Sequence, residues 1–245
     1  MVRIISACLI TVFFIFGCEK NLKIVIPEDV GGLLYKNSFE NESETIDGGT
    51  YTLKKDIHER SLIFKTKDSS FTRFKKEITL NKSFTLSFWF RPEFYGRNGT
   101  IITLSKDIMD FPLESTLSLY MNKNRIAAMH EGSDLRKVDY KNKNTFTTYF
   151  MSLKELNVSE TYFLTYIHNN NTVNILIDGE PYAEYENVPR LTSFNYITLG
   201  ASWNKQGGKY YFNGAIDDLY MFNRALNNED VFNIMNYTHV YQYAK

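Results

Sequence analysis

The chain has 245 residues, of which 43% are hydrophobic, and this is enough to build one large domain or two small ones. Basic and acidic residues number 28 each, so no net charge favours nucleic acid or an anionic membrane surface as a partner. Aromatic residues make up 16% of the chain, which is typical of strands that pack on a core. A single domain is the simpler interpretation.

The first 17 residues are predicted to be a targeting segment. Arg3 supplies a positive charge, residues 4–16 form an apolar stretch too short for an ordinary membrane span, and Gly17 precedes Cys18. The run from Ile15 to Cys18 resembles a bacterial lipobox, in which the cysteine is acylated and becomes the new N-terminus. A plain secretory signal with a chance cysteine is the alternative.

The cysteine positions favour the lipid anchor. Cys8 lies inside the predicted signal, so Cys18 is the one cysteine left after cleavage and no disulfide is expected within the domain. Glu19 is not the aspartate that some bacteria use as an inner-membrane retention signal, which favours the outer membrane of the cell envelope. Residues 18–32 are expected to be a tether, and residues 33–245 the folded domain.

The clearest predicted strand covers residues 84–91. One face is aromatic and aliphatic, with Phe84, Leu86, Phe88 and Phe90. The other face is more polar, with Thr85, Ser87, Trp89 and Arg91. The Trp89 side chain can either line an open concave surface or pack against the fold, and packing is favoured. Pro92 ends the strand because it cannot donate a ladder hydrogen bond.

Other short strands follow, separated by Gly, Asn, Asp and Lys. They are expected at residues 33–39, 100–105, 116–121, 125–130, 146–151, 162–168, 172–177, 182–185 and 215–222. Asp178-Gly179 is a strong two-residue hairpin signal. Because no long amphipathic helix intervenes, the pattern predicts an all-β, antiparallel sandwich of two sheets.

The segment from Gly200 to Gly208 is predicted to be a ligand-binding loop. Trp203 lies between a strand end and a Gly-Gly pair, where an exposed indole is expected. Sugars stack their C–H faces on indole rings, and amide groups match their hydroxyls. The candidate ligand-binding residues are therefore Trp203, Asn204, Gln206 and Tyr210, with Tyr211 as a further one. A tryptophan folded back over a sheet edge is the alternative.

The end of the chain predicts a strand, a tight corner and a short helix. In the strand, Asp217 has the parity of Leu219 and Met221, which would direct a carboxylate toward the interior, where it needs a cation, an arginine or backbone donors. In the helix, Asn227 is the expected N-cap, and Leu226 can pack on the apolar stripe that begins at Val231.

The run F-N-G-x-I-D-D-L-x-x-F-N-R-A-L, residues 212–226, resembles the closing motif of the bacterial laminin-G-like (concanavalin A-like lectin/glucanase) jelly-roll domains. Earlier landmarks of this family also occur in order, at residues 61–64, 83–92, 99–105, 173–179 and 196–200. The resemblance implies a jelly roll with a short C-terminal helix. Since this fold hosts lectins, glycanases, adhesins and spacers, the resemblance does not assign a function by itself.

The resemblance also implies a structural Ca²⁺ ion. In similar jelly rolls, calcium ties the N-terminal loop to the carboxylate that matches Asp217, and here Glu40 or Asn41 would complete the site with oxygen ligands. The glycine that usually follows in this loop is missing from the match at residues 39–41. The alternative is that Asp217 bonds to backbone amides or to Arg224.

No enzyme activity is expected. Retaining glycosidases of this fold carry Glu-x-Asp-x-(x)-Glu on a strand, which places nucleophile and acid about 5 Å apart, and this pattern is missing. The four histidines have no metal-binding spacing, and neither a nucleophile elbow nor a phosphate-binding loop occurs.

The sequence therefore predicts a lipid-anchored, non-catalytic domain that binds carbohydrate or another extracellular polymer. The alternative is an adhesion or scaffolding module that binds a surface protein and has no sugar site. A degenerate glycoside hydrolase is the least favoured of the three.

Overall fold

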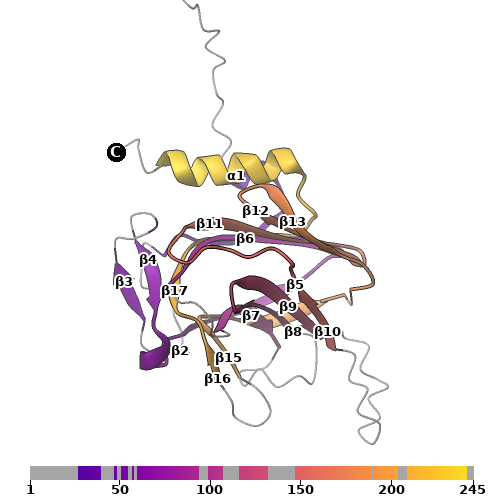
Figure 1. Cartoon of the computed structure of the whole chain (residues 1–245). Coiled ribbons are helices and arrows are strands. Elements are labelled where there is room, and N and C mark those ends of the chain that lie inside the picture. The colour runs from indigo at the N-terminus through magenta and orange to yellow at the C-terminus, as the bar shows by residue number, and fades with distance from the viewer. Residues whose placement is uncertain are drawn as a thin grey trace, which may run out of the picture.

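The computed structural model describes residues 27–39, 47–48, 51–54, 57, 60–93, 99–106, 116–131, 147–188, 190–203 and 209–241. Within these ranges the chain forms two stacked sheets and one α-helix, as Figure 1 shows. The predicted fold class, an all-β antiparallel sandwich with a short C-terminal helix, is confirmed. Among the described residues, no helix has the length and apolar character needed to cross a membrane.

The first sheet has eight strands in the described residues. Their order is β13 (Glu180–Tyr185), β12 (Thr172–Ile177), β11 (Tyr162–Asn169), β6 (Ser83–Pro92), β17 (Gly214–Phe222), β4 (Ser61–Phe64) and β3 (Thr52–Lys54), with β1 (Leu33–Asn37) beside the C-terminal half of β17. All of these pairings are antiparallel.

The second sheet has nine strands in the described residues. Its main path is β10 (Thr147–Met151), β9 (Arg125–Glu131), β8 (Thr116–Asn122), β7 (Gly99–Ser105), β14 (Ser193–Leu199), β5 (Thr72–Thr79) and β2 (Asp47–Gly48). A small hairpin of β15 (Ala201–Trp203) and β16 (Lys209–Tyr211) joins it, because β16 pairs in parallel with the start of β7. The hairpin projects from the lower edge of the molecule in Figure 1.

Alternation along the strands produces two apolar layers. On β6, the side chains of Phe84, Leu86, Phe88 and Phe90 belong to the core between the sheets. Trp89 faces the other way, into a second cluster beneath helix α1 (Asn228–Tyr241), which also contains Phe163, Val231 and Ile234. Its indole Nε1–H donates to Thr238 Oγ1 at 2.8 Å. The expectation that Trp89 packs within the fold is confirmed.

A bulge changes the predicted direction of Asp217. The register of β17 on β6 shifts between Asp217, which lies opposite Trp89, and Tyr220, and Asp218 takes a positive φ of 46° within this shift. Asp217 therefore shares the outer face of the sheet with Trp89 and Tyr220, whereas Leu219 points into the core. The prediction that Asp217 lies on the face of Leu219 and Met221 is wrong because a bulge inserts one extra residue and reverses the alternation.

The start of α1 carries the predicted cap. The Asp230 N–H donates to Asn227 Oδ1 at 2.8 Å, and the Asn227 N–H donates back to Asp230 Oδ2 at 3.1 Å, a reciprocal capping arrangement. Leu226 and Val231 lie together in the outer apolar cluster. The helix then continues to Tyr241.

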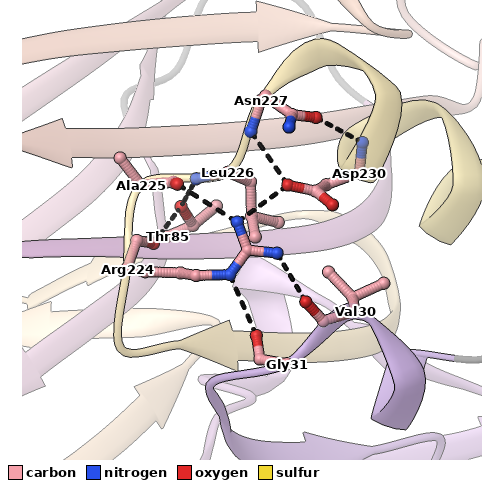
Figure 2. Close-up of polar contacts among 8 residues, drawn as sticks. All are labelled: Val30, Gly31, Thr85, Arg224, Ala225, Leu226, Asn227 and Asp230. Atoms are coloured by element: carbon pink, nitrogen blue, oxygen red, sulfur yellow. Dashed lines mark hydrogen bonds and ion pairs between the residues drawn. The ribbon is translucent and has the colours of Figure 1, made fainter.

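Arg224 connects the N-terminal segment to this helix start, as Figure 2 shows. Its guanidinium donates to the carbonyl oxygens of Val30 and Gly31 and to Asp230 Oδ2, the last at 2.8 Å. Val30 ends the short 3-10 helix η1 (Pro27–Val30), within the segment expected to be a tether. The Arg224 side chain therefore links residues 30–31, the corner after β17 and the start of α1.

Arg224→Met is expected to lower the free energy of unfolding by about 1–2 kcal/mol, because it removes these hydrogen bonds from a half-exposed side chain. Burial raises the pKa of Asp230, but its hydrogen bonds with Arg224 and the Asn227 N–H outweigh burial and hold this pKa below 3.8. The ion pair thus stabilises the fold above pH 4 and loses its contribution as the pH falls through the folded pKa. Urea unfolding at pH 7 and pH 3 measures both effects.

Arg190→Met is the matched control, since Arg190 makes one long hydrogen bond, to the Leu80 carbonyl at 3.4 Å. A loss at pH 7 no larger than that of the control, or a loss of equal size at both pH values, would contradict the role assigned to Arg224.

Candidate functional site

A hollow of about 440 Å³ opens at the end of the sandwich where β6 finishes and β17 begins. Five separate stretches of the described chain line it. The lining residues are Lys65, Thr66, Lys67, Pro92, Glu93, Gly99, Met121, Tyr211, Phe212 and Asn213. Lysine, glutamate, asparagine and aromatic residues therefore line one concave space.

Hydrogen bonds fix the backbone around this hollow. The Glu93 N–H donates to the Asn213 carbonyl at 3.0 Å, and the Phe212 N–H donates to the Gly200 carbonyl at 2.8 Å. Thr66 Oγ1 donates to the Tyr211 carbonyl at 3.2 Å. The wall formed by residues 211–213 is thus tied to the segments that directly follow β4, β6 and β14.

A glycine lets this wall approach β7. A Cβ atom at Gly99 would lie 2.6 Å from the Tyr211 carbonyl oxygen and 2.9 Å from Phe212 Cα. Those contacts are with backbone, which cannot rotate away. Gly99 therefore permits the parallel pairing of Tyr211 with Thr100 that places Tyr211 at the hollow.

The structure narrows the predicted ligand-binding loop. Trp203 and Lys209 are paired residues of β15 and β16, so the connection between the strands is residues 204–208. Asn204 and Gln206 lie outside the described residues, as does the side chain of Trp203. The expectation that Trp203 lies in a loop is wrong for its backbone, because it ends a strand.

Tyr210 and Tyr211 are adjacent in β16, and their side chains therefore point to opposite faces. Tyr210 is 43% exposed and does not line the hollow, whereas Tyr211 is half-buried and does. Of the tyrosines expected to bind ligand, the structure therefore brings Tyr211 to the hollow. Lys65, Glu93 and Asn213 were not predicted from the sequence, and Asn213 carried a signal only through the Phe-Asn-Gly motif.

Asp217 is 1% exposed, and both of its carboxylate oxygens are hydrogen-bonded. Oδ2 accepts from Ser61 Oγ at 2.9 Å, and Oδ1 accepts from the Asp218 N–H at 2.9 Å. Ser61 Oγ in turn accepts from the Ile57 N–H at 3.0 Å. The alternative in which Asp217 bonds to a backbone amide is thus present, and Arg224 makes its described contacts elsewhere.

The calcium expectation depends on residues of which only Asp217 is described, because Glu40 and Asn41 lie outside the described ranges. Each Asp217 oxygen accepts one of these hydrogen bonds, and carboxylate oxygens are the ligands that Ca²⁺ prefers. β1 runs antiparallel to β17 with Asn37 opposite Leu219, so the chain leads toward the Asp217 end of β17 as it leaves β1. Within the described ranges, no group of three or more His, Cys, Asp or Glu side chains can hold a metal.

A second hollow of about 440 Å³ lies on the outer face of the first sheet, beside the start of α1. Leu176 and Leu226 contribute apolar surface to it, and Asn174, Glu184 and Asn228 contribute polar groups. Phe232, one turn along α1 from Asn228, is 54% exposed. The first hollow differs from it in carrying lysines.

The family description "Concanavalin A-like lectin/glucanases superfamily" (Laminin_G_3) matches residues 65–232, more than half of the chain. The chain belongs to this superfamily. The match begins at Lys65, beside the first hollow, and ends within α1, so it covers most strands of both sheets of the concanavalin A-like domain. None of the curated proteins compared with the chain matches it.

Solved structures share this fold. Domain 4 of AbnA, a GH43 extracellular arabinanase from Geobacillus stearothermophilus, in complex with arabinotriose, is 17% identical, with a TM-score of 0.58 over 77% of this chain and 82% of that one. The receptor binding domain of botulinum neurotoxin type G is 16% identical, with a TM-score of 0.62 over 86% of this chain and 52% of that one.

A structure of botulinum neurotoxin type C, whose cell entry depends on two ganglioside molecules, is 16% identical, with a TM-score of 0.56 over 79% of this chain and 46% of that one. The concanavalin A-like domain thus spans about half the length of the toxin chains. At these identities the likeness concerns the fold.

Proposed function

We propose that this protein is a non-catalytic carbohydrate-binding domain of the cell envelope, and that the hollow lined by Tyr211 is its binding site. The observation that carries the proposal is the composition of this hollow. It combines aromatic and apolar surface from Tyr211 and Met121 with hydrogen-bonding groups from Asn213, Thr66 and Glu93. Sugar rings offer C–H faces to aromatic surface and hydroxyls to polar groups, so they match this lining.

The similar structures support this choice of ligand class. The arabinanase domain was solved with arabinotriose, and the type C neurotoxin interacts with gangliosides. Both ligands are carbohydrates or carry carbohydrate. Because the identities are low, the fold in common makes a sugar site plausible, and the lining of the hollow supplies the argument for this chain.

The arrangement of carboxylates supports binding without hydrolysis. A glycosidase needs two carboxyl groups across the scissile bond. Among the described residues, Glu93 is the one carboxylate that lines the hollow, and Arg91 Nη2 lies 3.2 Å from its Oε1. Asp217 lies on the outer face of the first sheet, where its oxygens accept hydrogen bonds from Ser61 and Asp218. The hollow is therefore suited to hold a ligand and not to cleave it.

Tyr211→Ala is expected to weaken glycan binding at least tenfold, because the aromatic ring on which a sugar would stack is lost while β16 keeps its backbone pairing. Tyr210→Ala is the matched control, since it removes the same ring from the opposite face of the same strand. A glycan array followed by titration calorimetry of the best ligand measures both. Equal losses of affinity in the two variants would indicate that the glycan binds at the hairpin of β15 and β16 and not in the hollow. Unchanged affinity in both variants would contradict the hollow as the site.

The proposal includes a lipid anchor at Cys18 in the outer membrane. Cys18→Ala is expected to move the protein from the membrane fraction to the soluble fraction, because no acyl chains can then be attached. Cys8→Ala, which changes the other cysteine inside the predicted signal, is expected to leave the protein in the membrane fraction. Membrane association of Cys18→Ala after carbonate washing would contradict the anchor.

A protein-binding adhesion module is the second candidate. The hollow beside α1 favours it, since Leu176 and Leu226 line this hollow and Phe232, one helical turn from its lining residue Asn228, is exposed. A glycan array without any hit, together with a surface-protein interaction lost in Phe232→Ser, would favour this candidate over carbohydrate binding.

A further inference from the structure

We infer that the hollow lined by Tyr211 selects acidic glycans, in which a sugar carries a carboxylate or a sulfate group. The inference rests on the proposed function, since it names the ligand class of the same site. It follows from the charges at the hollow and from the way the backbone fixes them.

Two lysines among the lining residues have no carboxylate partner in the described part of the chain. Lys65 and Lys67 are lining residues, and among the described residues no Asp or Glu oxygen lies within 4.0 Å of either ammonium nitrogen. A lysine ammonium offers three hydrogen-bond donors and no acceptor. These two groups are therefore available to an anionic ligand.

The carboxylate at the hollow does not cancel this charge. Glu93 is half-buried, and its Oε1 lies 3.2 Å from Arg91 Nη2. The charge of Glu93 is therefore balanced by Arg91 of β6. Lys65 and Lys67 remain as the unbalanced charges among the described lining residues. The charged residues of the lining thus have a net positive charge, although the formal net charge of the whole chain is zero.

The backbone holds the two lysines in place. Lys65 directly precedes the short 3-10 helix η3 (Thr66–Asp68), and Lys67 is the second residue of this helix. The Thr66 N–H donates to Asn213 Oδ1 at 3.4 Å, and Thr66 Oγ1 donates to the Tyr211 carbonyl at 3.2 Å. The backbone that carries both lysines is therefore fastened to the wall that carries Tyr211, so the two side chains start beside the aromatic surface.

The two chain segments that directly precede Gly99 and Lys209 are basic in composition. Residues 94–98 and 204–208 contain Arg97 and Lys205 and no acidic residue. The second hollow makes a useful contrast, because its charged lining residue is Glu184 and it has no lysine or arginine. A preference for anions is thus specific to the hollow at Tyr211.

The test uses the chain without its predicted signal and Cys18, titrated with three families of oligosaccharide. These are oligogalacturonate and its methyl ester, heparin fragments and their desulfated and carboxyl-reduced form, and neutral arabinan and galactan oligomers. Binding of the acidic form is expected to be at least tenfold tighter than that of its neutralised counterpart and to weaken as NaCl rises from 50 to 300 mM. The carboxylate and sulfate families identify which anion is preferred.

Lys65→Gln/Lys67→Gln is expected to remove this preference, lowering affinity for the acidic form about tenfold and leaving that for neutral oligomers unchanged. Lys75→Gln/Lys82→Gln removes two exposed cations elsewhere and is the charge-matched control. Equal affinity for acidic and neutralised forms, or equal effects of the two double variants, would overturn the inference while the carbohydrate site stands. No binding of any oligomer would overturn the proposed function and the inference with it.

Discussion

Trp89→Ala is expected to lower the free energy of unfolding by about 3–5 kcal/mol, the largest loss we predict for a single side chain. The indole is 9% exposed and lies in the layer between the first sheet and α1. Its ring centroid is 5.1 Å from that of Phe163, and its Nε1–H donates to Thr238 Oγ1. Alanine would open a cavity beneath the helix and leave the Thr238 hydroxyl without this donor.

Thr238→Val separates packing from hydrogen bonding, because valine keeps the shape of the side chain and removes the acceptor. We expect it to cost about 1 kcal/mol. Urea unfolding followed by circular dichroism measures both variants, and hydrogen exchange of α1 reports whether the helix loosens. A loss below 1 kcal/mol for Trp89→Ala would contradict the role of Trp89 as the main contact of the helix with the sheet.

Asp217→Ala is expected to destabilise the domain by about 2–4 kcal/mol, since the Ser61 hydroxyl and the Asp218 N–H would both lose their acceptor at a site hidden from water. Asp217→Asn keeps one acceptor oxygen and is expected to cost about half as much. Equal melting temperatures of the wild type and the alanine variant would contradict this account of the bulge.

The same residue tests the calcium proposal. We propose that Ca²⁺ binds Asp217 together with Glu40 or Asn41, in which case added calcium raises the melting temperature of the wild type and chelator lowers it. Asp217→Ala is expected to abolish the calcium response, and Glu40→Gln to reduce it. A wild-type melting curve that is identical in calcium and in chelator would contradict the metal site and leave the hydrogen-bonding role of Asp217 intact.

The sequence predicted the elements whose alternation is uninterrupted. On β6 the residues of even number face the core and Trp89 faces α1, so a period of two describes the strand correctly. β5 was missed, because the charged run from Lys75 to Glu77 lies on exposed or half-exposed positions and hides the period. Strands with one solvated half carry a weaker pattern than strands buried on both faces.

Two features depend on tertiary structure and left no readable pattern. The bulge at Asp218 needs a positive φ at a residue that is not glycine, and it reversed the predicted direction of Asp217. The hollow is assembled from residues as distant as Lys65 and Asn213, whose proximity follows from the pairing of β17 with β4 and β6. Residue types in a loop could suggest Tyr211, but not the cations that face the same space.

The central claim is that the hollow at Tyr211 binds a glycan and leaves it intact. The most direct test incubates the purified protein with the glycan that it retains best, and measures saturable binding and the release of reducing ends in the same samples. We predict saturable binding that Tyr211→Ala weakens at least tenfold, with reducing ends at the level of a protein-free control. Release of reducing ends that a single carboxylate substitution such as Glu93→Gln abolishes would contradict it.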